Sequence, residues 1–164
     1  EILQFMKSNV TKTAATKHMD VKFEIEQRID FQVKESYKTI SVLRNLAVNA
    51  LEAFEGSEGE IRVMVAWCRH SSLGPCHRIE VEDNGPGINE ADMETIFLPG
   101  YSTKMNMDTG FVQRGLGLSL VRDYVENDFG GRIRVKNKKD GGTRFVIEIP
   151  PGKFEEETRW IFTS

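Results

Sequence analysis

Three short stretches rich in asparagine and glycine constrain this chain most, because they lie far apart in the sequence. They are residues 45–50 (Asn-Leu-Ala-Val-Asn-Ala), residues 83–88 (Asp-Asn-Gly-Pro-Gly-Ile) and residues 114–118 (Arg-Gly-Leu-Gly-Leu). Six of the 14 glycines lie between Gly85 and Gly117, so backbone freedom is concentrated where a ligand would be wrapped. We expect a fold that brings the three stretches together around one ligand.

The composition is that of a soluble globular protein and excludes several classes of function. A length of 164 residues, with 39% hydrophobic and 29% charged residues, fits one domain with one core. The net charge of −3 gives no basic surface for nucleic acid or for direct contact with an anionic membrane. No apolar run approaches the roughly 20 residues of a membrane helix. No signal peptide is visible, and the missing initial Met suggests a piece of a longer protein.

The two cysteines lie close to two of the three histidines. Cys68 is followed by His70, and Cys76 by His77, which makes a four-ligand zinc cluster conceivable. The alternative is a hairpin loop flanked by strands, with Cys68 packed as a small hydrophobic residue. Because the spacing lacks the usual paired pattern of zinc ligands, the sequence favours the hairpin.

The hydrophobic periodicity predicts a chain of mixed helices and strands. Alternating apolar residues predict strands over residues 21–28, 60–67, 78–82, 132–135 and 143–149. Helical spacing predicts helices over residues 1–8, 36–54, 89–97 and 115–127. The third of these helices begins at Asn89, a plausible N-cap. A hairpin turn is predicted at residues 139–142.

The remaining segments read as loops. Residues 9–20 are polar and loop-like, and residues 98–114 have no clear period, as in a lid or binding loop. We expect residues 1–19 to be the end of a preceding helical region and a linker, residues 20–150 to be the main domain, and residues 151–164 to be a tail.

The predicted helix over residues 36–54 carries polar side chains on one face. Ser41, Asn45, Asn49 and Glu52 recur at steps of three or four residues. Asparagine is a mediocre helix former, so two of them one turn apart need a reason. One explanation is a solvated helix face. The other is that the Asn49 amide oxygen binds Mg²⁺, which prefers oxygen ligands, and that Asn45 lies beside phosphates.

The other two stretches suit the remaining parts of a nucleotide. Asp83 can accept a hydrogen bond from an exocyclic amine such as adenine N6, and Gly85 and Gly87 let the backbone approach a flat base. The free amides of a helix starting at Gly115 suit phosphate oxygens, and Lys104 can reach a terminal phosphate. Taken singly, these features also fit an ordinary turn, close helix packing and a solvated lysine.

Together the stretches resemble the catalytic ATP-binding domain of sensor histidine kinases. That family lies in a superfamily with DNA gyrase, the heat-shock protein 90 chaperones and MutL. The resemblance covers residues 20–150. Residues 43–53 look like the asparagine box, and residues 83–88 and 115–118 match the two glycine motifs. Phe97 stands at the phenylalanine motif, and residues 142–143 look like a late Gly-Thr whose threonine supports the aspartate.

The resemblance implies an α+β fold, a two-layer α/β sandwich known as the Bergerat ATP-binding fold. Its mixed, mostly antiparallel sheet is covered on one face by three helices, with ATP and Mg²⁺ bound between the helices and the lid. It assigns catalytic roles to Asn45 and Lys104, and the metal to Asn49. The implied nucleotide-binding residues are Asn45, Asn49, Asp83, Gly85, Gly87, Ile88, Phe97, Tyr101, Ser102, Thr103, Lys104, Arg114, Gly115, Leu116, Gly117, Leu118 and Thr143.

Two positions depart from the family pattern. Residues 99–101 (Pro-Gly-Tyr) occupy the place where many members have a second phenylalanine. Gln113 and Arg114 precede Gly115, so one glycine of the second motif is missing. Either the phosphate contacts from this loop are fewer, or Arg114 supplies charge instead.

The residue four positions before the metal-binding asparagine separates kinases from hydrolases in the superfamily. Relatives that hydrolyse ATP have a glutamate there to activate water, whereas this chain has Asn45. Glu52 lies on the other side of Asn49 and is no simple replacement. Without a positioned base, attack by water loses a factor of roughly 10² to 10⁴. The resemblance therefore implies phosphoryl transfer with poor intrinsic hydrolysis.

The implied acceptor is a histidine on a separate helical dimerisation domain of the same parent protein, with a response regulator as an indirect partner. None of His18, His70 and His77 stands in the acceptor context, so we interpret them as structural or surface residues. We expect a cytoplasmic domain, whether or not the parent is membrane-anchored. Two alternatives remain: an ATP-hydrolysing conformational clamp of the gyrase or MutL type, and a non-catalytic interaction module that keeps the fold.

Overall fold

The computed structural model describes residues 1–100, 104–105, 112–113 and 117–156, and only the backbone at 104–105 and 112–113. The order of elements is α1 (Ile2–Thr16), β1 (Asp20–Gln27), α2 (Ser36–Ala53), β2 (Glu58–His70), β3 (Gly74–Asp83), the 3₁₀ turns η1 (Glu90–Asp92) and η2 (Thr95–Phe97), β4 (Lys104–Met105), β5 (Val112–Gln113), α3 (Gly117–Asp123), the π-helical turn η3 (Tyr124–Asp128), β6 (Arg132–Asn137), β7 (Thr143–Ile149) and α4 (Pro151–Phe154).

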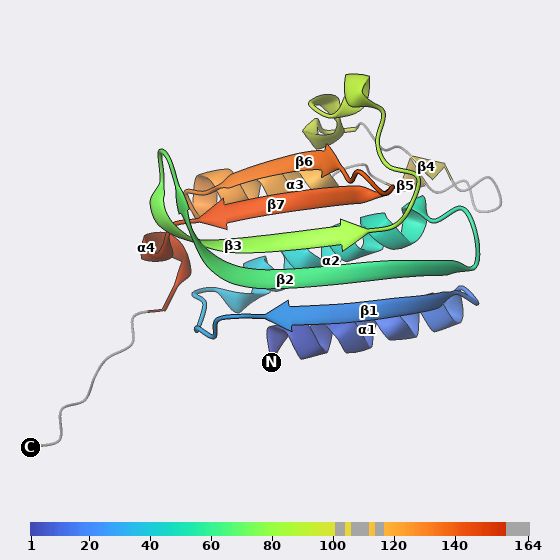
Figure 1. The fold of residues 1–164 in the computed structure, drawn as a ribbon, viewed down its shortest axis with the longest axis horizontal. Helices are drawn as coiled ribbons and strands as arrows, with labels where there is room; N and C mark the ends of the chain where they lie inside the picture. Colours follow the sequence, from blue (N-terminus) through green and yellow to red (C-terminus); the bar gives the residue numbers. More distant parts are fainter. Residues whose placement is uncertain (101–103, 106–111, 114–116, 157–164) are drawn as a thin grey trace, which may run out of the picture.

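Five strands form one mixed sheet in the order β1-β2-β3-β7-β6. The pairing of β1 with β2 is parallel, and the other three pairings are antiparallel. Helices α1, α2 and α3 lie behind the sheet in Figure 1 and cover one of its faces, which leaves the opposite face open. This confirms the predicted two-layer fold.

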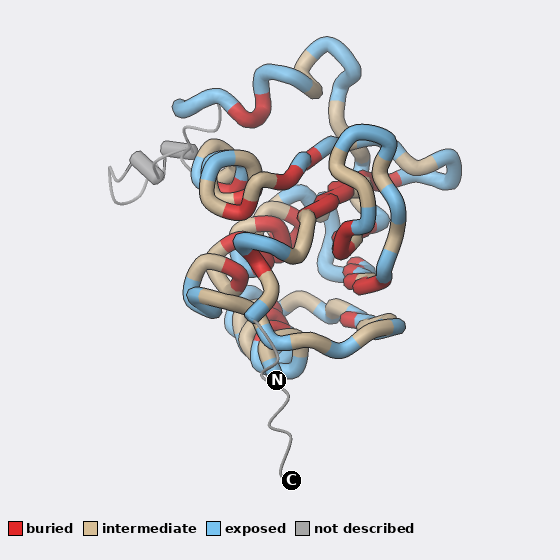
Figure 2. Tube along the Cα trace, turned by 90° about the vertical axis from the view of Figure 1, so that its left-hand side faces the viewer, coloured by how far each residue is buried: buried red, intermediate tan, exposed pale blue. Residues whose placement is uncertain are grey.

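The core lies between the sheet and the helices, and buried residues gather in the interior (Figure 2). The alternation within each strand turns one residue in two toward the helices, as with Ile61, Val63 and Val65 of β2. Helix α2 contributes Leu46 and Ala50 to this core; the two residues lie one turn apart, and both are buried. Burying one large apolar side chain stabilises the fold by about 1.5–3 kcal/mol, so this interface dominates the stability.

Helix α1 is longer than the sequence indicated, and the predicted loop over residues 9–20 is wrong in most of its length. The helix continues to Thr16 because Met6, Val10 and Ala14 form a buried apolar stripe at steps of four residues. This stripe is difficult to recognise in the sequence because threonines and lysines separate its three apolar residues. Helix α1 packs on α2 and on β1.

Other predicted boundaries also move. Strands β2 and β3 extend through most of the predicted loop over residues 70–77, and the turn between them reduces to the three residues 71–73, followed by Gly74 at φ 72°. Residues 89–97 do not form one helix but the two 3₁₀ turns, although the predicted cap is correct, since Asn89 Oδ1 accepts from the Ala91 N–H at 3.1 Å. The hydrogen-bonding pattern of the helix after Gly117 changes to a π turn near its end.

The short helix α4 closes the far end of the sheet. Phe154 is fully buried and packs against Phe31, His77 and Phe129. The core thus includes a residue beyond the predicted domain end at residue 150. The apolar residues 160–162 of the tail lie outside the described part of the chain.

Candidate active site

Helix α2 carries the first of the three stretches and holds Asn45 in a fixed orientation. The Asn45 Nδ2 donates to the Ser41 carbonyl oxygen at 2.8 Å, one turn back along the helix. Its Oδ1 lies against the start of α3, where a Cβ added to Gly117 would stand 3.0 Å from that oxygen. A side chain at Gly117 would require the Asn45 carboxamide to shift by a few tenths of an ångström. This contact brings the first stretch directly against the third.

The second stretch meets the same helix at its C-terminal end. A Cβ added to Gly85 would lie 3.8 Å from the Ala53 Cβ and 3.6 Å from the ring of Phe54. Asn45 and Ala53 are eight residues apart, about 12 Å along the helix axis, and Asn49 lies midway between them. The three stretches therefore come together along two turns of α2.

Asp83 ends β3 with its side chain almost removed from solvent, at 5% exposure. Its Oδ1 accepts from the Gly85 N–H at 2.9 Å, and the backbone N–H of Thr143 also donates to the carboxyl group. Burial raises the pKa of Asp83 above its usual value, while these two donors and the charge of Lys138 act in the opposite direction. The two N–H groups fix the carboxyl group in one place.

The Gly142-Thr143 pair lies directly behind Asp83. Thr143 pairs with Asp83 in the β3–β7 ladder and is buried. Gly142 has φ 101°, and a Cβ there would overlap the Asp83 carbonyl oxygen and lie 2.9 Å from the Asn84 Cα. Only glycine tolerates both this positive φ and the close approach of the Asp83 backbone. The structure thus places Thr143 beside the aspartate, where the sequence analysis expected it.

Two asparagines that the sequence analysis did not single out hold the second stretch in place. Asn137, at the end of β6, accepts from the Ile88 N–H at 2.8 Å and donates to the Ile88 carbonyl at 2.7 Å. A Cβ added to Gly87, which has φ 85°, would stand 2.8 Å from the Asn137 Oδ1. Asn84 Oδ1 accepts from the Glu60 N–H at 2.7 Å, which ties the stretch to β2. The only signal in the sequence was an asparagine at a strand end.

The other predicted residues divide into three groups. Phe97 is buried, edge-on to the Phe145 ring, and the Arg122 guanidinium lies 5.6 Å from its centroid. Leu118 is half-buried and packs against the core from α3. Lys104 is placed by its backbone alone, in β4 opposite Gln113 of β5. The predicted residues outside the described part of the chain are Tyr101, Ser102, Thr103, Arg114, Gly115 and Leu116.

Comparison with known proteins identifies the family. The family described as histidine kinase-, DNA gyrase B- and HSP90-like ATPase matches residues 34–153, which is most of the chain. This chain belongs to that family.

This domain is similar to two proteins that are named as sensors. It is 34% identical over 125 residues to the sensor protein CitS of Halalkalibacterium halodurans, covering 76% of this chain and 22% of the relative. It is 42% identical over 113 residues to the sensor histidine kinase DcuS of Escherichia coli K12, covering 68% and 18%. The chain thus spans about a fifth of the length of these relatives.

A solved structure agrees with this assignment. The catalytic domain of the histidine kinase ThkA superposes with a TM-score of 0.71 and 29% identity, over 92% of this chain and 90% of that one. The fold and the predicted family are confirmed, and the chain is the ATP-binding catalytic domain of a sensor histidine kinase. Among its described residues, no helix is long and apolar enough to cross a membrane.

The residues present fit a nucleotide and its cation. Asp83 offers a fixed carboxyl group as acceptor for an amine, and Gly85 leaves the backbone beside it free of side chain. The Asn49 carboxamide is half-buried and makes no hydrogen bond to another described residue, so its oxygen is available to a hard cation. Asn45, whose amide nitrogen is already bonded, turns its oxygen toward the start of α3.

Proposed function

We propose that this domain binds Mg-ATP and donates the γ-phosphoryl group to a histidine on a separate dimerisation domain of its parent protein, in two-component signalling. The observation that carries the proposal is the convergence on α2: Asn45 touches Gly117, and Gly85 packs two turns further on, beside Asp83. The family assignment and the sensor histidine kinases among the relatives support it.

Each residue has a role that follows from its chemistry. Asp83 accepts a hydrogen bond from the adenine amine, and Asn49 holds Mg²⁺ through its amide oxygen. Amides at the start of α3, with Asn45 nearby, receive the phosphates, and Lys104 neutralises the terminal phosphate. When bound, the cation neutralises phosphate charge. Phosphoryl transfer asks little more of a protein than this positioning and neutralisation.

Asn45 favours transfer over hydrolysis. A carboxamide cannot take a proton from water, and the Asn45 nitrogen is engaged by the Ser41 carbonyl. The chain therefore lacks a base at this position, and water attack stays slow.

An exposed apolar surface beside the site suits the partner domain. Leu98 is 53% exposed and Leu120 is 38% exposed. Leu120 lines a cavity of about 510 Å³, and Leu98 lies in the chain between Phe97 and Pro99, which also line it. An apolar patch with a charged rim is typical of a helix-binding surface. We assign this surface to the helices that carry the acceptor histidine. A related kinase, ThkA, was solved in complex with the response regulator TrrA, which supports a regulator as a further partner.

Calorimetry with ATP, with and without Mg²⁺, tests the nucleotide site. We expect 1:1 binding that strengthens with Mg²⁺, is abolished by Asp83→Asn and loses its Mg²⁺ dependence in Asn49→Ala. Asn9→Ala on α1 is the matched control and should bind as the wild type does. Unchanged ATP binding in Asp83→Asn would refute this site.

Phosphotransfer is tested by mixing the domain with the parent's histidine-bearing domain and labelled ATP. Acid-labile phosphohistidine is the expected product. Binding of ATP without any label on histidine would favour the non-catalytic interaction module, and steady ADP release without transfer would favour the clamp.

A further inference from the structure

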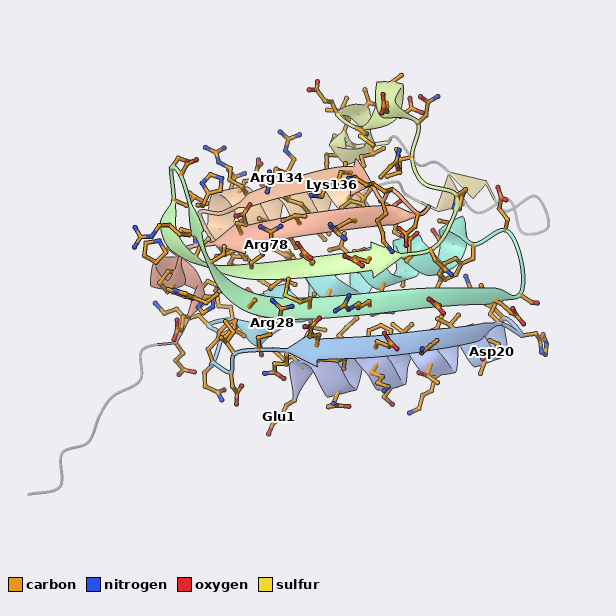
Figure 3. All side chains as sticks on the ribbon, viewed as in Figure 1. Glu1, Asp20, Arg28, Arg78, Arg134 and Lys136 are labelled. Atoms are coloured by element: carbon orange, nitrogen blue, oxygen red, sulfur yellow. The ribbon has the colours of Figure 1, made fainter. Side chains whose placement is uncertain are left out.

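The open face of the sheet carries a group of buried donor atoms that the nucleotide site does not use. Alternation along β2, β3 and β7 turns Cys68, Cys76 and Glu148 away from the helices, onto the face that Figure 3 turns toward the viewer with Arg78 and Arg134 labelled. Cys76 is seven residues from Asp83, about 23 Å along β3, and points to the opposite side of the sheet. This group is therefore separate from the ATP site.

The three side chains lie close enough to share one ligand. Cys68 and Cys76 stand directly opposite each other in the β2–β3 ladder, with their Sγ atoms 3.0 Å apart. The Cys68 Sγ is 3.6 Å from the Glu148 Oε2, and one donor atom from each residue fits within 4.8 Å of the others. Cys76 is fully buried, while Cys68 is half-buried and leaves an approach from solvent.

Glu148 is held in an orientation that leaves one oxygen for this group. Its side chain is buried, at 3% exposure, and its Oε1 accepts from the Arg134 guanidinium at 2.8 Å. The Oε2 faces Cys68 instead. A buried carboxylate is unfavourable unless its oxygens are compensated, and Arg134 compensates only one of them.

Electrostatic repulsion among the three side chains also favours a bound cation. The donor atoms of Cys68, Cys76 and Glu148 lie within 4.8 Å of one another, and each belongs to a group that is negative when ionised. Ionising all three together brings like charges close to one another. A cation among them removes this repulsion, and the two thiol protons leave to solvent when it binds.

We infer that Cys68, Cys76 and Glu148 bind a thiophilic divalent cation of the Zn²⁺ type, through two thiolates and one carboxylate oxygen. Tetrahedral Zn²⁺ with bonds near 2.3 Å to sulfur and 2.0 Å to oxygen requires separations of about 3.8 Å between the sulfurs and about 3.5 Å between sulfur and oxygen. The observed 3.0 and 3.6 Å need the two thiols to part by less than about 1 Å. The fourth position opens to solvent beside Cys68.

This site differs from the four-ligand Cys/His cluster considered from the sequence, which the structure does not form. The His70 Nδ1 accepts from the N–H groups of Ser72 and Leu73 in the hairpin turn. His77 points to the helix side of the sheet and pairs with Glu155 at 2.8 Å. Glu148 takes the place of the histidines.

A disulfide between the two cysteines is the competing chemistry. A disulfide gives no role to the Glu148 Oε2, which lies 3.6 Å from the Cys68 sulfur. The third donor therefore favours a cation.

Titration of the reduced, metal-free chain with Co²⁺ tests the inference, followed by Zn²⁺ competition against a chromophoric chelator. We expect one equivalent of Co²⁺ with a thiolate-to-metal charge-transfer band, displaced by Zn²⁺. Cys68→Ser should weaken Zn²⁺ binding by about 100-fold or more, and Glu148→Gln by about tenfold. His70→Gln is the control and should bind as the wild type does.

Several outcomes would overturn the site. They are no charge-transfer band, unchanged affinity in Cys68→Ser, or a chain that gains only a Cys68–Cys76 disulfide on exposure to air. Cys68 is half-buried, so its serine variant should stay folded, and Glu148→Gln gives an independent reading. Asp83→Asn should leave the cobalt band unchanged, and Cys68→Ser should leave ATP binding unchanged. Failure of this inference is thereby distinguishable from failure of the proposed function.

Discussion

The carboxyl group of Asp83 links ligand binding to stability at the level of one residue. Its pKa is raised in the folded protein, chiefly by burial, so the native state holds the proton more tightly than the unfolded chain, where the pKa is about 3.9. The stability contributed by this group is complete below the unfolded pKa and is lost as pH rises through the folded pKa. Above the folded pKa, ionised Asp83 therefore weighs against folding.

Asp83→Asn removes the charge but keeps an oxygen that can accept from the Gly85 N–H. We expect its free energy of unfolding, relative to wild type, to increase from about pH 4 upward and then level off, while ATP binding is lost. Urea unfolding of both proteins across that range measures the difference. A variant that is less stable than wild type at neutral pH would contradict this account.

Substitutions at two adjacent glycines distinguish the cost of backbone strain from the cost of steric overlap. Gly141 and Gly142 both have a positive φ, but a Cβ at Gly141 meets nothing within 4 Å, whereas one at Gly142 overlaps the Asp83 backbone. We expect Gly141→Ala to lower the free energy of unfolding by about 1 kcal/mol and Gly142→Ala by about 3 kcal/mol or more. Thermal unfolding measures both. Equal losses would show that the close approach has no energetic weight.

At the scale of elements, Phe154 is the residue that anchors α4 in the core. Its ring is fully buried against Phe31 and Phe129, so Phe154→Ala should leave a cavity and lower the free energy of unfolding by about 3–5 kcal/mol. Phe5→Ala removes an equally large but exposed ring and should change it by less than about 1 kcal/mol. Denaturant unfolding gives both values. A small loss in Phe154→Ala would mean that α4 is not part of the cooperative unit.

Elements with a strong local pattern were predictable, and elements decided by distant partners were not. Helix α2 and the inward faces of the strands follow directly from apolar spacing. The second half of α1 was missed because its three buried positions are spread among threonines and lysines. Phe154 was missed for a related reason: a single phenylalanine in a charged tail has no period, and only tertiary packing shows its role.

The residues of the candidate site divide in the same way, into those marked by a local motif and those placed by a distant partner. Asn45, Asp83 and Gly117 were predicted because each belongs to a motif with its own local logic. Asn137 was not, because its carboxamide contacts Ile88 from 49 residues away, and no local pattern marks such a pair. Lys104 and its neighbours stay predictions.

At the scale of the whole molecule, the two faces of the sheet serve different purposes. The helix-covered face holds the core and the nucleotide residues. The open face carries ion pairs such as Arg78–Glu80 and Arg144–Glu82. The edge strand β6 adds Arg134 and Lys136, labelled in Figure 3, and such charges discourage pairing with the edge of another chain. The apolar surface around Leu98 and Leu120 is the one that we assign to a helical partner.

That surface gives a prediction for the assembled kinase. Because Leu98 and Leu120 are exposed, the double variant Leu98→Ser, Leu120→Ser should fold and bind ATP as the wild type does. Loss of two central apolar anchors should lower the rate of transfer to the separate histidine domain by about tenfold or more at subsaturating concentrations of that domain. Tyr37→Ser, at an exposed aromatic residue on α2, is the control. Radiolabel transfer measures the rate, and a double variant that transfers at the wild-type rate would place the partner on a different surface.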